Sequence, residues 1–288
     1  MAELAVITPS YGPDFELCRD LNASVLACTP TSTSHYIIAP ERDLELFSAL
    51  RGPRTQVWSV DRMLPRYVLS IPRVNAWLNL RHPFPPIRGW VMQQVAKLHA
   101  AAQIEADVLL SVDSDVAFVR PVTAQTFRQA GRTCFYRKDG GVHEGLTRHL
   151  AWHDVARKLL GVPSARPPLP DYIQSPNFWD RGTILAMRDR IQEVTGQPWL
   201  LAIAAQPRFS ECTLYGVFVD EVLGERSNVT PVESVRCHGY WERYPLSLDA
   251  AHQFLRAMPA EDVAVMISAK SRTPLSVRRA VMSGLWAR

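Results

Sequence analysis

The sequence of 288 residues lacks the two glycine-rich loops by which many nucleotide-binding domains hold phosphate. No Gly-x-Gly-x-x-Gly follows the first apolar run, and no Walker-type lysine loop occurs in the chain. The first absence argues against a dinucleotide-binding Rossmann domain, because that domain needs its glycines for close approach of the backbone to the pyrophosphate. A nucleotide, if bound, requires a different device for its phosphates, and a metal ion is one such device.

The sequence also lacks a cysteine framework, a secretion leader and a membrane-spanning run. An odd number of cysteines without any Cys-x-x-Cys pair favours reduced thiols. The first residues enter a strand-like run without the charged leader of a signal peptide, and no apolar stretch approaches the roughly 20 residues of a membrane-spanning helix. We therefore expect a cytoplasmic protein, with peripheral attachment at the inner face of the membrane as a further option. The cysteines are Cys18, Cys28, Cys134, Cys212 and Cys237.

Strong charge of either sign is absent as well. Charged residues make up 21% of the chain and hydrophobic residues 47%, which is ordinary for a folded globular protein. The formal net charge of +4 suits phosphate-bearing ligands or an anionic membrane surface, but it is too small to indicate a nucleic-acid partner. The 22 prolines indicate long ordered loops.

The N-terminal part alternates strand and helix patterns. Residues 4–8, 35–39 and 55–60 are short β-branched runs, whereas residues 14–28 and 41–50 carry apolar side chains at helical spacing. A βαβαβ order predicts an α/β fold with a mostly parallel sheet and right-handed crossovers.

The middle of the chain is predicted to contain a long ordered loop and then a helix and strand. Residues 61–86 are rich in proline and arginine and read as a loop, residues 87–104 as a helix and residues 108–112 as a buried strand. We place a soft boundary near Gly140, between a predicted nucleotide-binding half, 1–140, and a predicted acceptor-binding and C-terminal half, 141–288, of the same domain.

Two carboxylates follow the buried strand. Asp113 and Asp115 stand at its C-terminal edge, with only Ser114 between them, and that edge of an α/β sheet is where ligands bind. Such a pair suits a hard divalent cation that holds phosphate oxygens. A chain of this length contains about one Asp-x-Asp by chance, so a solvated turn is the alternative interpretation.

Three further residues are candidates for the same site. Lys97, on the helix before the strand, is a candidate contact to phosphate or base, with plain solvation as the alternative. Glu211 falls in the first turn of a helix predicted from the N-cap Ser210 to about Leu223, where capping alone can explain a carboxylate but a catalytic base can also be held. His238 gains weight as a ligand only if a metal is bound at the acidic pair.

Two other segments leave alternatives open. The segment SPNFWDRG, residues 175–182, offers Asn177, Trp179 and Asp180 for stacking on and hydrogen bonding to sugars or other polar ligands. Phe178 and Trp179 can equally be ordinary core. Residues 274–288 have the composition of a basic amphipathic helix, which either packs against the domain or contacts a membrane surface.

Taken in order, these parts resemble a GT-A glycosyltransferase. More narrowly, IRGWVMQQVAKL, ADVLLSVDSDVAFVRP and SECTLYG are similar to the bacterial GT-A-like family DUF6492, over most of residues 4–245. The resemblance implies a GT-A-like, mostly parallel sheet flanked by helices. It also implies transfer of a sugar from a nucleotide diphosphate sugar donor to an acceptor sugar or small molecule, with Mn²⁺ or Mg²⁺ bridging the diphosphate and the acidic pair.

The same resemblance assigns roles to residues. Asp113 would face the nucleotide sugar, and Asp113, Asp115 and His238 would surround the metal. Glu211 would be the general base if the enzyme inverts configuration, which is slightly favoured, and a retaining mechanism would dispense with it. The loop that would cradle the base and ribose comprises Pro9, Ser10 and Tyr11.

Two other functions remain as alternatives. A nucleotidyltransferase also combines an α/β sheet with acidic metal ligands, although Pro9 to Pro13 is not the glycine- and arginine-rich loop typical of that class. The third interpretation is a catalytically silent nucleotide-sugar-binding protein. Fold resemblance alone does not decide among them.

Overall fold

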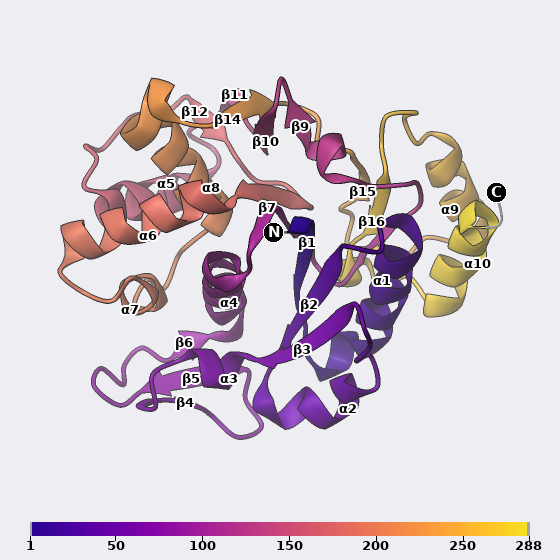
Figure 1. The fold of residues 1–288 in the computed structure, drawn as a ribbon, viewed down its shortest axis with the longest axis horizontal. Coiled ribbons are helices and arrows are strands. Elements are labelled where there is room, and N and C mark those ends of the chain that lie inside the picture. The colour runs from indigo at the N-terminus through magenta and orange to yellow at the C-terminus, as the bar shows by residue number, and fades with distance from the viewer. Residues whose placement is uncertain (1, 287–288) are drawn as a thin grey trace.

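The computed structural model describes residues 2–286 and is built around a five-stranded sheet in the order β13-β7-β1-β2-β3 (Figure 1). Strands β1, β2, β3 and β7 are parallel, and β13 joins β7 as an antiparallel edge strand. The predicted α/β fold with a mostly parallel sheet is therefore confirmed. The strands are β1 (Ala2–Pro9), β2 (Ser34–Ala39), β3 (Thr55–Ser59), β7 (Ala106–Ser111) and β13 (Asn177–Asp180).

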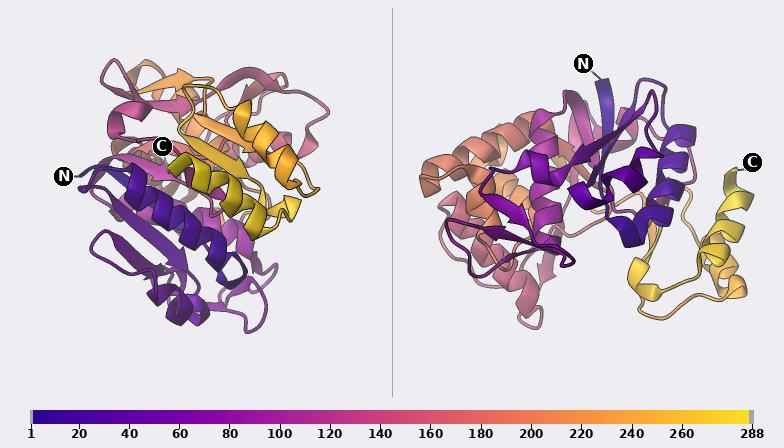
Figure 2. Two further views of the ribbon diagram at one scale, coloured as in Figure 1. Left: turned by 90° about the vertical axis from the view of Figure 1, so that its right-hand side faces the viewer. Right: turned by 90° about the horizontal axis from the view of Figure 1, so that it is seen from below.

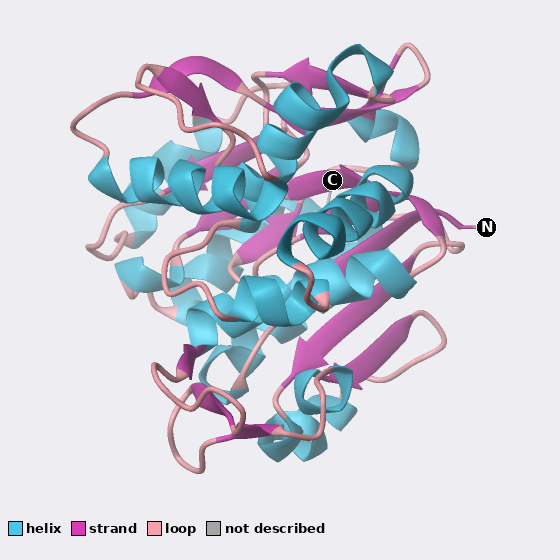
Figure 3. Cartoon of the chain, turned by 90° about the vertical axis from the view of Figure 1, so that its left-hand side faces the viewer, coloured by secondary structure: helices cyan, strands magenta, loops and turns pink. Residues whose placement is uncertain are grey.

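Both faces of the sheet are buried, which explains why its strands read as continuous apolar runs. In β1, Leu4 and Val6 face the core under α1 (Phe15–Cys28), whereas Ala5 and Ile7 face the core under α4 (Gly89–Gln103). The larger core also takes in α6 (Arg181–Thr195) and α7 (Trp199–Ala204), and α2 (Leu44–Ser48) packs on the α1 side. Figure 3, drawn from the side of α4 and α6, shows this helical layer in front of the strands.

The strand order reverses next to β1. The chain winds from β1 through β2 to β3 on one side, and then crosses back through α4 to β7 on the other side of β1. In open α/β sheets the crevice at the carboxyl ends of the two strands that flank such a switch point is the usual ligand site. Here those ends are Pro9 and Ser111.

Residues 61–86 form the predicted loop only in part. After α3 (Val60–Met63) the chain makes an antiparallel meander of β4 (Val68–Ser70), β5 (Ala76–Asn79) and β6 (Ile87–Arg88). One side chain of each strand, Val68, Trp77 and Ile87, packs into the larger core. The loop prediction missed these strands because each buries so few residues that no alternation is visible in the sequence.

A second sheet follows the acidic pair directly. It joins β8 (Val116–Phe118), β16 (Ala264–Ile267) and β15 (Cys237–Tyr240), with α9 (Leu248–Arg256) and α10 (Leu275–Trp286) beside it. Figure 2 shows α10 lying along α1, and Arg279 pairs there with Glu16 and Asp20.

The described part of α10 packs against the domain. Val281 and Met282 are buried in the core beside the second sheet. The predicted membrane contact of residues 274–288 includes Leu285 and Trp286, whose side chains are not described, and Arg288, which lies outside the described residues; this contact stays a prediction. Within residues 2–286, no helix is long and apolar enough to cross a membrane.

The second half of the chain shares the core of the first. Strand β13 extends the main sheet, and the larger core runs from Ala5 to Val229. Ser210 caps α8 (Glu211–Val217) by accepting a hydrogen bond from Thr213 N, and a π-helix (Phe218–Leu223) continues it, so the predicted cap and helix are confirmed. The other elements are β9 (Arg128–Gln129), β10 (Arg132–Tyr136), β11 (Lys138–Val142), α5 (Thr147–Leu160), β12 (Leu169–Asp171) and β14 (Val229–Val232). Single 3₁₀ turns lie at 12–14, 41–43, 124–127, 224–226 and 269–271.

Candidate active site

A cleft of about 350 Å³ opens at the carboxyl ends of β1 and β7. Pro9 lines it after β1, and Asp113 and Asp115 line it after β7. Lys97 of α4 and Glu211 of α8 line it as well. The structure thus brings together residues that the sequence placed far apart, at the switch point of the sheet.

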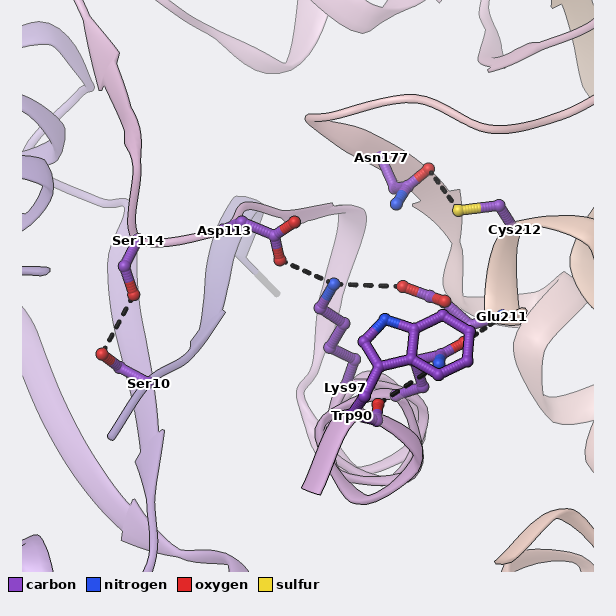
Figure 4. Close-up of polar contacts among 9 residues, drawn as sticks. Ser10, Trp90, Lys97, Asp113, Ser114, Asn177, Glu211 and Cys212 are labelled. Carbon is purple, nitrogen blue, oxygen red and sulfur yellow. Dashed lines mark hydrogen bonds and ion pairs between the residues drawn. The ribbon is translucent and has the colours of Figure 1, made fainter. Parts of the chain in front are cut away.

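Lys97 connects the two acidic parts of this cleft (Figure 4). Its Nζ lies 2.8 Å from Asp113 Oδ1 and 3.0 Å from Glu211 Oε1. Lys97 and Glu211 are each 7% exposed, whereas Asp113 is 52% exposed. Burial opposes the charge of Lys97, but the two carboxylates outweigh it and raise the pKa of the ammonium. Lys97 is therefore a fixed cation between α8 and the turn 113–115, which we call the acidic turn.

Helices α4 and α8 are also joined by an amide. Gln94 Oε1 accepts a hydrogen bond of 2.9 Å from the backbone N–H of Glu211, and its Nε2 donates one of 3.2 Å to Trp90 O. Trp90, Gln94 and Lys97 are spaced by four and three residues, so they share one face of α4. This bond orients the first turn of α8 and holds Glu211 against Lys97.

Asp115 lies deeper than Asp113. Its Oδ2 accepts a hydrogen bond of 2.8 Å from Ala269 N. Burial, and then the neighbouring charge of Asp113, raises the pKa of Asp115 to about 6, although the Ala269 bond and Arg278 act the other way. Burial and Asp113 likewise raise the pKa of Asp14. These carboxylates repel one another, and a cation between them would relieve that repulsion.

The acidic turn fits a divalent cation that the protein holds only in part. Among residues 2–286, no group of three His, Cys, Asp or Glu side chains is placed to hold a metal. Asp113 and Asp115 can supply two carboxylates, and Mg²⁺-like ions commonly take their other ligands from water and substrate phosphates. The donor set thus suits Mn²⁺ or Mg²⁺ bound together with a phosphorylated ligand.

His238 does not line the cleft. Its Nε2 lies 2.9 Å from Phe254 O, and its ring stacks on that of Phe254 with the centroids 4.2 Å apart. The structure does not bring His238 together with Asp113 and Asp115 in the way that the sequence interpretation required.

The loop after β1 lies at the edge of the cleft. Pro9 lines the cleft, and Ser10 and Tyr11 line a small adjoining cavity of about 20 Å³. Ser114 Oγ donates a hydrogen bond of 3.0 Å to Ser10 Oγ, which ties this loop to the acidic turn. The three residues are thus near the site, and their contact with a base and ribose stays a prediction.

On the opposite wall, sequence reasoning offered Asn177 but missed Gln174 and Trp90. Asn177 lines the cleft and accepts a hydrogen bond of 3.2 Å from the thiol of Cys212. Gln174 Oε1 and Ser175 Oγ line it too, and these two buried atoms have no hydrogen-bond partner among the described residues. Buried polar atoms are nearly always paired, so these two are exceptions along this wall. Trp90 could have been found from its helical spacing to Lys97.

Comparison with known proteins places the chain in a family. The model of a family of unknown function, DUF6492, matches residues 10–229. The chain belongs to DUF6492. No curated protein matches it.

Several solved glycosyltransferases are similar to this DUF6492 chain in fold. The bifunctional glycosyltransferase WbbM has a TM-score of 0.50 at 9% identity, over 92% of this chain and 45% of WbbM. An active-site mutant of LgtC scores 0.46 at 12% identity, over 98% of this chain and 95% of that one. Mouse xyloside xylosyltransferase 1 scores 0.46 at 11% identity, over 96% of this chain and 100% of that one. The predicted GT-A-like fold is confirmed.

Proposed function

We propose that this DUF6492 protein is a metal-dependent glycosyltransferase that moves a sugar from a nucleotide diphosphate sugar to an acceptor. The observation that carries the proposal is the pair Asp113 and Asp115 at the switch point of the sheet, in a cleft of about 350 Å³. The GT-A-like fold supports it, since that fold is shared with glycosyltransferases, and fold alone would not suffice.

The acidic turn would hold the donor. Asp113 and Asp115 would bind Mn²⁺ or Mg²⁺, and the ion would supply charge stabilisation to the diphosphate leaving group without proton transfer. Pro9, Ser10 and Tyr11 would contact the base and ribose at the end of β1. We assign His238 no role in metal binding, because its Nε2 is hydrogen-bonded to the carbonyl of Phe254.

Lys97 and Glu211 would serve the reacting end of the donor. Lys97 places a buried positive charge 2.8 Å from Asp113, and this charge would help to stabilise the charge that develops on a diphosphate held at the pair. Lys97 engages Glu211 at Oε1, so the base role in an inverting transfer would fall to Oε2, which bonds to no other described residue. Inversion remains slightly favoured, and a retaining enzyme would use Glu211 only to fix Lys97.

The second half of the chain would bind the acceptor. Residues 141–288 supply the far wall of the cleft, including Gln174, Ser175 and Asn177, whereas residues 1–140 supply the acidic turn. We place the reaction in the cytoplasm, with a small molecule or sugar as acceptor and no nucleic-acid partner.

A ligand screen followed by product analysis tests this function. Thermal unfolding is measured with a panel of nucleotide sugars, each with and without Mn²⁺. A donor at 100 times its Kd stabilises the fold by about 2.7 kcal/mol, and we expect that gain to require the ion. Turnover should then release nucleoside diphosphate. Pyrophosphate would indicate nucleotidyl transfer instead, and ion-independent binding without turnover would indicate a silent binding protein.

A further inference from the structure

A second hollow, of about 380 Å³, adjoins the cleft and shares three lining residues with it. The shared residues are Trp90, Arg148 and Trp152. We call this hollow the arginine annex, because three of its lining side chains are arginines and none is acidic. Its other lining residues are Arg88, Thr147, Pro207 and Arg208.

The positive charge of the annex is not neutralised within the described residues. Arg88 and Arg208 are exposed, and neither side chain makes an ion pair or hydrogen bond with another described residue. The guanidinium of Arg148 lies 4.7 Å from the ring centroid of Trp152 and 5.0 Å from that of Trp90. These cation–π contacts orient Arg148 without removing its charge.

Two helices begin at the annex and add to its positive potential. Arg88 precedes α4, and Thr147 and Arg148 open α5. Neither helix has a side-chain cap at its N-terminus or an acidic residue in its first turn. Helix N-termini carry partial positive charge and usually have acidic or capping residues near them. An anion bound in the annex would meet both helix ends and the arginines.

The opening formed by the cleft and the annex therefore has two walls of opposite charge. Asp113 and Asp115 line the acidic wall, and the arginines line the other. Trp90 belongs to both parts and is 40% exposed, so its indole offers a platform for a sugar ring.

We infer that the annex binds the phosphate of a phosphorylated carbohydrate whose sugar ring rests on Trp90. Guanidinium groups recognise phosphate by two parallel hydrogen bonds, which makes arginine better suited to this than a single ammonium. The assignment of this ligand as the acceptor rests on the proposed function, whereas the binding of a phosphorylated sugar does not. The phosphate can belong to a soluble sugar phosphate or to a lipid.

Calorimetry with simple probes tests the inference on the full chain. The probes are glucose 1-phosphate and glucose, titrated at low ionic strength into the wild type, the double variant R88Q/R208Q and the control R51Q. Arg51 is exposed and its side chain has no partner among the described residues. We expect the wild type and R51Q to bind glucose 1-phosphate at least about tenfold more tightly than glucose, and R88Q/R208Q to lose most of that preference.

The membrane arm uses phosphatidylcholine vesicles with and without phosphatidic acid. Association that depends on phosphatidic acid and is weakened in R88Q/R208Q would identify a lipid phosphate as the source. Sugar phosphate binding without vesicle association would identify a soluble one. The inference is overturned if R88Q/R208Q keeps the wild-type response to both probes while its melting temperature shows that it is folded.

Thermal unfolding of the same variants with a nucleotide sugar and Mn²⁺ tests the proposed function separately. Mn²⁺-dependent stabilisation by a nucleotide sugar should be unchanged in R88Q/R208Q, because the annex does not include the acidic turn. If the wild type binds glucose 1-phosphate but no nucleotide sugar, the glycosyltransferase proposal is rejected and the phosphate site stands. If the wild type binds a nucleotide sugar but does not prefer glucose 1-phosphate to glucose, the phosphate site is rejected and the glycosyltransferase proposal stands.

Discussion

The ammonium of Lys97 lies 3.0 Å from the carboxylate of Glu211, and both side chains are almost fully removed from solvent. The same ammonium reaches Asp113 in the exposed turn at 2.8 Å. Lys97 thus pairs with two carboxylates, whereas the buried carboxylate of Glu211 pairs with Lys97 alone among the described residues.

We therefore expect Lys97 and Glu211 to differ in the free energy of unfolding that is lost when each is replaced. Lys97→Met leaves Glu211 buried without a cation, and breaking a buried pair in this way costs about 3–5 kcal/mol. Glu211→Gln leaves Lys97 paired with Asp113 and should cost about 1–2 kcal/mol. Denaturant unfolding of both variants measures the difference. Equal costs, or a larger cost for Glu211→Gln, would show that Asp113 does not compensate Lys97.

His35 makes the stability of the fold depend on pH. The imidazole is fully buried between Thr8 Oγ1, at 2.9 Å, and Asn22 Oδ1, at 2.8 Å. Burial lowers its pKa to about 3, whereas the unfolded chain has an ordinary value near 6.5. Between these values the unfolded state binds the extra proton, so this contribution is complete above about pH 6.5 and is lost as the pH falls toward 3.

The expected loss at pH 5, relative to pH 7, is about 2 kcal/mol from His35 alone. The free energy of unfolding is measured across this range for the wild type, His35→Gln and His252→Gln. His252 is exposed and serves as the control. We expect His35→Gln to flatten the profile and His252→Gln to leave it unchanged. A wild-type slope in His35→Gln would contradict the assignment.

Two adjacent arginines of α10 should differ sharply in their contribution to stability. Arg278 is 4% exposed and donates to the carbonyls of Ile267, Ser268 and Thr273. Arg279 is 40% exposed and pairs with acidic residues of α1.

Arg278→Met leaves buried carbonyls unpaired and should cost about 3 kcal/mol. Arg279→Gln removes two ion pairs at the surface, together worth at most about 1–2 kcal/mol and weakened by salt. Unfolding at low and high ionic strength measures both. A salt-sensitive loss in Arg278→Met, or a large loss in Arg279→Gln, would reverse the assignment.

The sequence carried the local features of the site. Continuous apolar runs identified β1 and β7, and the position of Asp113 and Asp115 followed because the carboxyl end of a buried strand is the ligand side of such a sheet. Ser210 predicted the start of α8, since a serine before a helix is an effective cap. Each inference needed only neighbouring residues.

Features that depend on distant pairing were not predictable in the same way. Phe178 and Trp179 left a sugar-stacking and a core interpretation equally open. As part of β13 they point into opposite cores of the sheet, and both are 1% exposed. The partner strand, β7, lies far earlier in the chain. His238 was interpreted as a ligand by its residue type, whereas its partner Phe254 belongs to α9, which the sequence did not reveal.

The arginine annex was missed for the same reason. Arg88 and Trp90 come from the start of α4, Arg148 from α5, and Arg208 from the segment before α8. No local pattern connects these positions. Only the packing of three helices places their side chains around one hollow.

Turnover of Asp115→Asn tests the central claim most directly. The substitution keeps an oxygen that can accept the hydrogen bond from Ala269 but removes the charge. Asp107→Asn, at the other end of β7, is the matched control, because Asp107 is exposed and, among the described residues, pairs only with Arg128. Release of nucleoside diphosphate is measured with the donor found in the ligand screen and Mn²⁺. We predict a loss of at least about a hundredfold in Asp115→Asn and wild-type turnover in Asp107→Asn. Undiminished turnover in a folded Asp115→Asn protein would contradict the account.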